Sequence, residues 1–156
     1  MKKFTDNLSK LIATFFGLGY FPCIPGTLGS VAGVVIWYLL CARQEVFYAV
    51  LFLVLISGFL TTGRAAKILG GTDPRLIIID EVSGMLVALT FVPFGVLNMV
   101  IVFALFRIFD VAKPYPIRKL EALPGSAGIM FDDIAAGVYA NLVFQLVFRC
   151  ALCRAV

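Results

Sequence analysis

The sequence contains no histidine, and this absence excludes several kinds of chemistry. A histidine nucleophile and a Ser–His–Asp triad are both impossible. Zinc is also disfavoured, because the closely spaced cysteines Cys150 and Cys153 have no second Cys-x-x-Cys motif or histidine to complete a ligand set. We therefore interpret the four cysteines as spectators. The chain also lacks a Walker A motif, a Cys-x5-Arg phosphatase loop and a DxDxT motif.

Charged residues are scarce as well. They make up 14% of the chain, and 62% of its residues are hydrophobic, whereas soluble proteins average about 25% charged residues. This composition is typical of a membrane protein. The net charge of +4 comes from basic residues in short stretches between apolar runs. We interpret them as topology signals and anionic-lipid contacts, and we expect no nucleic-acid partner.

The apolar runs predict an all-α, membrane-embedded helical bundle that forms a single domain over residues 1–156. Residues 46–62 form the clearest spanning helix. The other expected elements are a short apolar segment at 8–19, a helix at 29–41 whose small residues suit close packing, and a last helix at about 132–153. Residues 19–30, rich in Gly and Pro, and the polar residues 63–75 are expected to form loops.

The apolar run after Asp80 is interrupted at Pro93–Gly95, and this interruption decides whether two acidic residues can meet. In one straight helix, Asp80 and Asp110 would lie about 45 Å apart. If the chain reverses at Pro93–Gly95, the two halves form a short helical hairpin and both acids return to one face. The reversal also places the basic stretches on the cytoplasmic side, as the positive-inside tendency favours. We therefore predict the hairpin.

Acidic residues gather beside apolar sequence at Asp80, Glu81, Asp110, Asp132 and Asp133. Helix capping explains one acid per helix, but two adjacent pairs would repel unless a positive charge lies between them. Carboxylate oxygens suit Mg²⁺, which we predict as the cofactor of this cluster. A cation of this kind polarises phosphoryl oxygens and activates water, and a carboxylate serves as base. An aspartyl-phosphate intermediate is the alternative.

Groups suited to phosphate binding surround these acids in the sequence. The stretch PGTLGS contains Thr27 and Ser30 within flexible backbone, and Arg107 and Lys113 flank Asp110 at three residues on either side. A Pro-Gly turn and a surface ion pair are the simpler readings of the same residues. We predict Thr27, Ser30, Arg107 and Lys113 as substrate-binding residues.

Together these motifs resemble the phosphatidylglycerophosphatase A family. The matching segments are GLGYFPCIPGTLGS (17–30), IIIDEVSGM (77–85) with the preceding Asp-Pro pair, FRIFDVAKPYPIRKLE (106–121) and GIMFDDIAAG (128–137). The resemblance implies an all-α bacterial membrane enzyme, built around a central helix. It also implies Mg²⁺-dependent removal of the terminal phosphate of the membrane lipid phosphatidylglycerol phosphate, which yields phosphatidylglycerol. The family's acidic motifs fall on the five acids, and its lysine falls on Lys113.

These expectations place a multi-pass enzyme in the bacterial inner membrane, with its site facing the cytoplasm. The alternative is a small ion or solute transporter, because carboxylates between membrane helices often mark ion pathways. The sequence leaves open the number of metal ions, the identity of the base and the oligomeric state.

Overall fold

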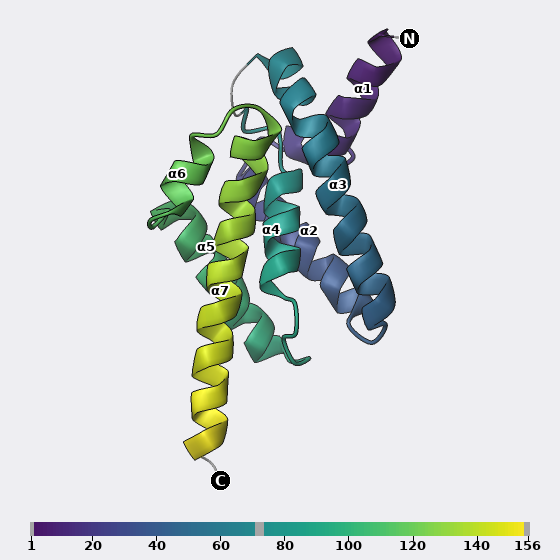
Figure 1. The fold of residues 1–156 in the computed structure, drawn as a ribbon. Helices are drawn as coiled ribbons and strands as arrows, with labels where there is room; N and C mark the ends of the chain where they lie inside the picture. The colour runs from purple at the N-terminus through teal and green to yellow at the C-terminus, as the bar shows by residue number, and fades with distance from the viewer. Residues whose placement is uncertain (1, 71–73, 155–156) are drawn as a thin grey trace.

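The computed structural model describes residues 2–70 and 74–154 of the chain (Figure 1). The helices are α1 (Lys2–Ala13), α2 (Pro25–Leu40), α3 (Gln44–Leu69), α4 (Ile79–Ala88), α5 (Val96–Ala112), α6 (Ile117–Glu121) and α7 (Ser126–Arg154), with a 3₁₀ turn, η1 (Leu18–Tyr20). The described residues include no β-strand. The predicted all-α fold is therefore confirmed.

Helix α4 lies at the centre of the bundle and packs against α2, α3 and α7 (Figure 1). Most of its ten residues are buried, including Asp80 and Ser83, two of its three polar residues. Ten residues span only about 15 Å of helix, so α4 cannot cross the bilayer core, which is about 30 Å thick. Its role is to carry polar side chains into a bundle that longer helices surround.

Small residues allow α4 to lie very close to its two main neighbours. A Cβ atom added to Gly33 of α2 would lie 2.8 Å from the Cβ atom of Met85. A Cβ atom added to Gly84 of α4 would lie 2.5 Å from the backbone oxygen of Asp133, and Gly137 of α7 faces the backbone of Gly84 in turn. Close backbone approach through small residues is typical of membrane helix packing. It brings the acids of α4 and α7 together.

The chain reverses between α4 and α5, as the Pro93–Gly95 interruption predicts. Asn98 donates a hydrogen bond to the carbonyl of Pro93 (3.0 Å), and the ring of Phe94 stacks on Trp37. Helix α7 packs extensively against both α4 and α5, which contact each other less. From α7, Asn141 donates to the carbonyls of Ala88 (2.9 Å) and Thr90 (2.6 Å) at the end of α4. The third helix therefore stabilises the hairpin.

Three helix boundaries differ from the sequence-based expectation. Helix α2 begins at Pro25, so PGTLGS forms its first turns and is not a loop; proline is well suited to the first helical position because it lacks an N–H group. Helix α3 continues to Leu69 through the stretch expected to be a polar loop, since Ala65 and Ala66 pack into a core beneath α1. Helix α7 begins at Ser126, so Asp132 lies within the helix.

Within the described part of the chain, two helices are long and apolar enough to cross a membrane: α3, and residues Ser126–Phe148 of α7. The surface of α3 exposes large apolar side chains, among them Phe52, Leu53 and Leu60. The beginnings of α4 and α7 and the end of α3 lie at the same end of the bundle (Figure 1). This end holds the polar cavity described next.

Candidate active site

A cavity of about 580 Å³ lies where α4 and α7 carry their acids and α5 ends. All five acids predicted from the sequence line it: Asp80, Glu81, Asp110, Asp132 and Asp133. They come from three helices that are far apart in the sequence. The hairpin between α4 and α5 is what returns Asp110 to the level of Asp80.

Three of these acids form a compact group. One carboxylate oxygen from each of Asp80, Glu81 and Asp133 lies within 4.8 Å of the other two. Asp80 and Asp133 are buried, and Asp80 Oδ1 accepts a hydrogen bond from the backbone N–H of Glu81 (3.1 Å). Asp80 and Glu81 occupy the first turn of α4, where the helix dipole favours negative charge. One buried oxygen, Glu81 Oε2, has no hydrogen-bond partner among the described residues. This buried acidic cluster could bind a metal ion.

The other two acids are each held by a basic side chain. Arg107 Nη1 lies 2.8 Å from Asp110 Oδ2, and Lys113 Nζ lies 2.9 Å from Asp132 Oδ2. Asp110 stands near the C-terminal end of α5, where the helix dipole disfavours a carboxylate. The guanidinium group one turn earlier offsets this cost. The structure therefore divides the five acids into a group of three and two ion pairs.

Lys113 connects three elements around the cavity. It ends α5 in the left-handed region (φ 41°), and its ammonium group contacts Glu121 of α6 (2.8 Å) as well as Asp132 of α7. Burial alone would lower the pKa of Lys113, but the hydrogen bonds to Glu121 and Asp132 outweigh it and raise the pKa above its ordinary value. Lys113 therefore stays charged at the edge of the cavity.

The first turn of α2 closes the cavity against Glu81. A Cβ atom on Gly26 would lie 2.5 Å from Glu81 Oε1, so the carboxylate rests against bare backbone at this position. Ser30, fully buried, donates a hydrogen bond to the Gly26 carbonyl (3.1 Å) and accepts one from Arg107 (3.4 Å). Ser30 and Thr27 are not part of the cavity lining. Their predicted contact with phosphate stays a prediction.

Sequence reasoning missed several lining residues. Arg75 and the segment from Tyr20 to Ile24 also line the cavity, and Glu121 contacts it through Lys113. From the sequence alone, Arg75 is interpreted as a topology signal. Its position a few residues before Asp80 and Glu81 is the one sequence feature that could have indicated a place in the site. Asp73 and the side chains of Cys150 and Cys153 lie outside the described residues.

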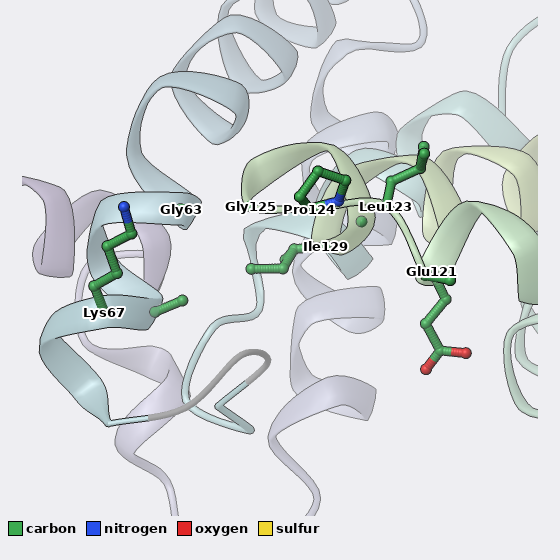
Figure 2. Close-up of a pocket in the computed structure, with 10 residues that line it drawn as sticks. Gly63, Lys67, Glu121, Leu123, Pro124, Gly125 and Ile129 are labelled. Atoms are coloured by element: carbon green, nitrogen blue, oxygen red, sulfur yellow. The ribbon is translucent and has the colours of Figure 1, made fainter.

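A second cavity, of about 460 Å³, lies nearby between α3 and the α6–α7 connection. Figure 2 shows Lys67 and Glu121 on opposite sides of it, with Leu123, Pro124 and Ile129 between them. Glu121 thus lies between the two cavities, since its carboxylate also contacts Lys113.

Comparison with known proteins identifies a family for the chain. Residues 11–148 match the protein family described as Phosphatidylglycerophosphatase A. The chain is 37% identical over 147 residues to a "Putative phosphatidylinositol-3-phosphatase" of Bacteroides thetaiotaomicron, a match that covers 89% of this chain and 92% of the relative.

Two other relatives are named "Phosphatidylglycerophosphatase A". The protein from Escherichia coli is 39% identical over 136 residues (85% of this chain, 79% of the relative), and that from Haemophilus influenzae is 35% identical over 141 residues (88% and 86%). No solved structure matches the chain. The match over most of the chain confirms the predicted family and supports phosphatidylglycerophosphatase activity. The chain belongs to the phosphatidylglycerophosphatase A family.

Proposed function

We propose that this protein hydrolyses phosphatidylglycerol phosphate to phosphatidylglycerol and inorganic phosphate at the cytoplasmic face of the bacterial inner membrane. The observation that carries the proposal is the cavity with five acids, set at one end of a bundle with two long apolar helices. A lipid phosphate needs a polar site at the depth of the headgroups, because its acyl chains stay in the bilayer. Family membership supplies the substrate class.

Mg²⁺ is the proposed cofactor, and Asp80, Glu81 and Asp133 are the residues that would hold it. Their oxygens are hard ligands of the kind Mg²⁺ prefers, and the buried Glu81 Oε2 without a hydrogen-bond partner among the described residues fits a ligand atom. When bound, the ion would polarise the phosphoryl group and lower the pKa of a coordinated water. Asp110 and Asp132, predicted as further ligands, have a second role in this proposal because each holds a basic side chain.

Lys113 and Arg107 are the proposed phosphate-binding residues. Each is fixed by a carboxylate and still has N–H groups to donate to phosphoryl oxygens. A water oxygen attacks phosphorus, the bond from phosphorus to the glycerol oxygen breaks, and that oxygen leaves as a hydroxyl group. A carboxylate of the cavity accepts the proton that the attacking water loses and returns it to the departing glycerol oxygen. Fixed cations stabilise the charge that builds up on the phosphoryl oxygens in the transition state.

The proposed topology is multi-pass, with the cavity in the inner leaflet. Basic residues at the end of α3 and around α6, such as Lys67, Arg118 and Lys119, lie on the elements that surround the cavity end. This distribution agrees with a cytoplasmic position for that end. A transporter would need a site that both aqueous compartments reach, whereas these acids gather at one end of the bundle.

A second substrate follows from the Bacteroides relative, whose name specifies phosphatidylinositol-3-phosphatase. Phosphatidylinositol 3-phosphate and phosphatidylglycerol phosphate share a phosphomonoester and a phosphodiester on one headgroup. The acidic cavity suits either phosphomonoester, so the two lipids need to be compared directly.

The test measures phosphate release by the purified protein in detergent from both lipids, with Mg²⁺ and with excess EDTA. We expect phosphate release from phosphatidylglycerol phosphate in the presence of Mg²⁺ and none in excess EDTA. Asp80→Asn should abolish release, because it removes a charge from the group of three acids, while the protein still inserts and purifies normally. Asp6→Asn is the matched control, since Asp6 pairs with Arg64 (2.8 Å) away from the cavity. A wild-type rate from the Asp80→Asn protein would contradict the proposed site.

A further inference from the structure

We propose that Arg75 binds the internal phosphodiester of the lipid substrate and so selects lipids that carry a second phosphate behind the one removed. This inference rests on the proposed function and deepens it. In the proposed function the acids, Lys113 and Arg107 act on the terminal phosphate, and no residue is assigned to the second one. Arg75 lines the same cavity from a segment that the proposed mechanism does not use.

The backbone of Arg75 is held firmly at the cavity edge. Arg75 lies within a turn in which the N–H of Ile77 donates to the carbonyl of Pro74 (2.9 Å). The next residue, Ile78, donates to the carbonyl of Ala13 (3.0 Å), and the side chains of Ile77 and Ile78 are buried. These hydrogen bonds and buried side chains hold the backbone from which the Arg75 side chain extends.

The turn is also fixed to the segment that forms the apolar rim of the cavity. Gly19 in η1 lies so close to the backbone of Leu76 that any side chain on Gly19 would collide with the Leu76 carbonyl. This contact sets Arg75 beside Tyr20, Phe21 and Ile24, which also line the cavity. Each of the three exposes more than half of its surface. Exposed apolar side chains at the mouth of a polar site suit contact with lipid.

The basic residues in and beside the cavity differ in how far they are already engaged. Arg75 and Lys113 line the cavity, whereas Arg107 lies beside it and pairs with the lining residue Asp110. Lys113 contacts two carboxylates, and Arg107 contacts Asp110 and Ser30. Arg75 is exposed and forms no ion pair within the described part of the chain. Its guanidinium group is therefore the cation of this cavity best placed to bind a new anion without first giving up a partner.

The features of the cavity follow the order of groups in the substrate. The acids that α4 and α7 contribute are mostly buried, Lys113 is partly buried at the edge, and both Arg75 and the apolar lining residues of segment 20–24 are exposed. In phosphatidylglycerol phosphate, the terminal monoester is followed by a glycerol unit, the phosphodiester and then the acyl chains. Guanidinium groups bind phosphate oxygens in a bidentate geometry, which suits the diester.

The experiment compares Arg75→Gln, Arg75→Lys and Lys67→Gln with the wild type in mixed micelles containing Mg²⁺. Lys67→Gln is the matched control, because it removes one exposed positive charge from α3 at a different cavity. For phosphatidylglycerol phosphate, we expect Arg75→Gln to raise KM about tenfold, at the low end of the effect of a charged hydrogen bond because the side chain is exposed. We expect kcat to change by less than about twofold, since the diester is not the reacting group.

Phosphatidate separates specific contact from general attraction, because it carries one phosphate only. Arg75→Gln should leave KM for phosphatidate unchanged, and Lys67→Gln should behave as wild type. Arg75→Lys should recover only part of the affinity for the two-phosphate lipid, because lysine keeps the charge and loses the bidentate geometry. Equal losses on both lipids, or equal effects of Arg75→Gln and Lys67→Gln, would overturn the inference in favour of general electrostatics.

A binding measurement keeps this inference separate from the proposed activity. Phosphatidylglycerol carries the phosphodiester alone, and its affinity for the detergent-solubilised protein needs no turnover. Arg75→Gln should weaken this affinity by a factor similar to the change in KM. Unchanged affinity would refute the role of Arg75 whatever the activity, whereas failure of the proposed function would appear as no phosphate release from the wild type.

Discussion

The contact between Gly26 and Glu81 offers a sharp test of the site, because one methyl group there acts on one carboxylate. The Cβ atom of alanine at position 26 would lie 2.5 Å from Glu81 Oε1, whereas ordinary contact begins at 3.4 Å, so the carboxylate must move by about 0.9 Å. Arg107 Nη1 lies 3.7 Å from the same point and needs no movement. The perturbation therefore acts on the group of three acids and leaves the phosphate-binding cation in place.

A displacement of about 1 Å in a catalytic group can cost about a hundredfold in rate. We therefore expect Gly26→Ala to lower kcat for phosphatidylglycerol phosphate by about two orders of magnitude at saturating Mg²⁺, and to raise the Mg²⁺ concentration needed for half-maximal activity. The melting temperature in detergent should change little, because the atom that must move is the end of the flexible Glu81 side chain and not backbone, and because alanine is the better helix former by up to about 1 kcal/mol.

Val31→Ile is the control for added volume, because Val31 lies on the same helix with an exposed side chain. A second variant, Glu81→Asp, shortens the carboxylate by one methylene and removes the collision. The double variant Gly26→Ala, Glu81→Asp should be more active than the product of the two single effects predicts. Full activity of Gly26→Ala, or strict additivity in the double variant, would refute the view that Glu81 must rest against bare backbone.

Two further predictions concern the residues that assemble the cavity. Lys113→Met should lower the rate of phosphate release by about a hundredfold or more, comparable to the loss of one transition-state hydrogen-bond donor. Lys113→Arg should retain part of the rate, because it keeps the positive charge. Equal rates for the two variants would contradict a role for this charge. Gly84→Ala should lower the free energy of unfolding by about 1–3 kcal/mol, because its methyl group would meet the backbone of Asp133 at 2.5 Å. Gly95→Ala is the control, because its methyl group would meet only the side-chain amide of Asn98. Its melting temperature in detergent should equal that of the wild type. A similar loss of stability in Gly84→Ala and Gly95→Ala would contradict a tight α4–α7 contact.

Much of the architecture was predictable from where the chain places its few charges. Burying a carboxylate in a strongly apolar chain costs free energy. Asp80 and Asp110 lie at the ends of apolar runs, so we favour topologies in which the two acids share a polar site. The Pro93–Gly95 break then left the hairpin as the arrangement that joins them. Convergence of the acids on one cavity follows from this reversal.

Helix boundaries were not predictable in the same way. Gly and Pro in PGTLGS indicate a loop by propensity, yet Gly26, Gly29 and Gly33 face Glu81, Ile78 and Met85 at distances that leave no room for a side chain unless the neighbour moves. The glycines serve packing against α4, and propensity is a weak guide when tertiary contacts override it. The expectation of flexible backbone around Ser30 is wrong for the same reason, because Ser30 lies inside α2; its contact with phosphate stays a prediction.

The charge of the cavity explains why metal and phosphate should bind together. Five carboxylates line it, Glu121 contacts its Lys113, and the basic side chains at the same place are Arg75, Lys113 and Arg107, which leaves a formal charge of −3 among these described residues when all are ionised. A phosphate dianion entering such a cavity alone would be repelled, and the repulsion is strong where water is excluded. One divalent cation cancels most of this charge. Each ligand therefore removes the electrostatic cost of the other, so the affinity for phosphate should depend on the cation and the affinity for the cation on phosphate by the same factor.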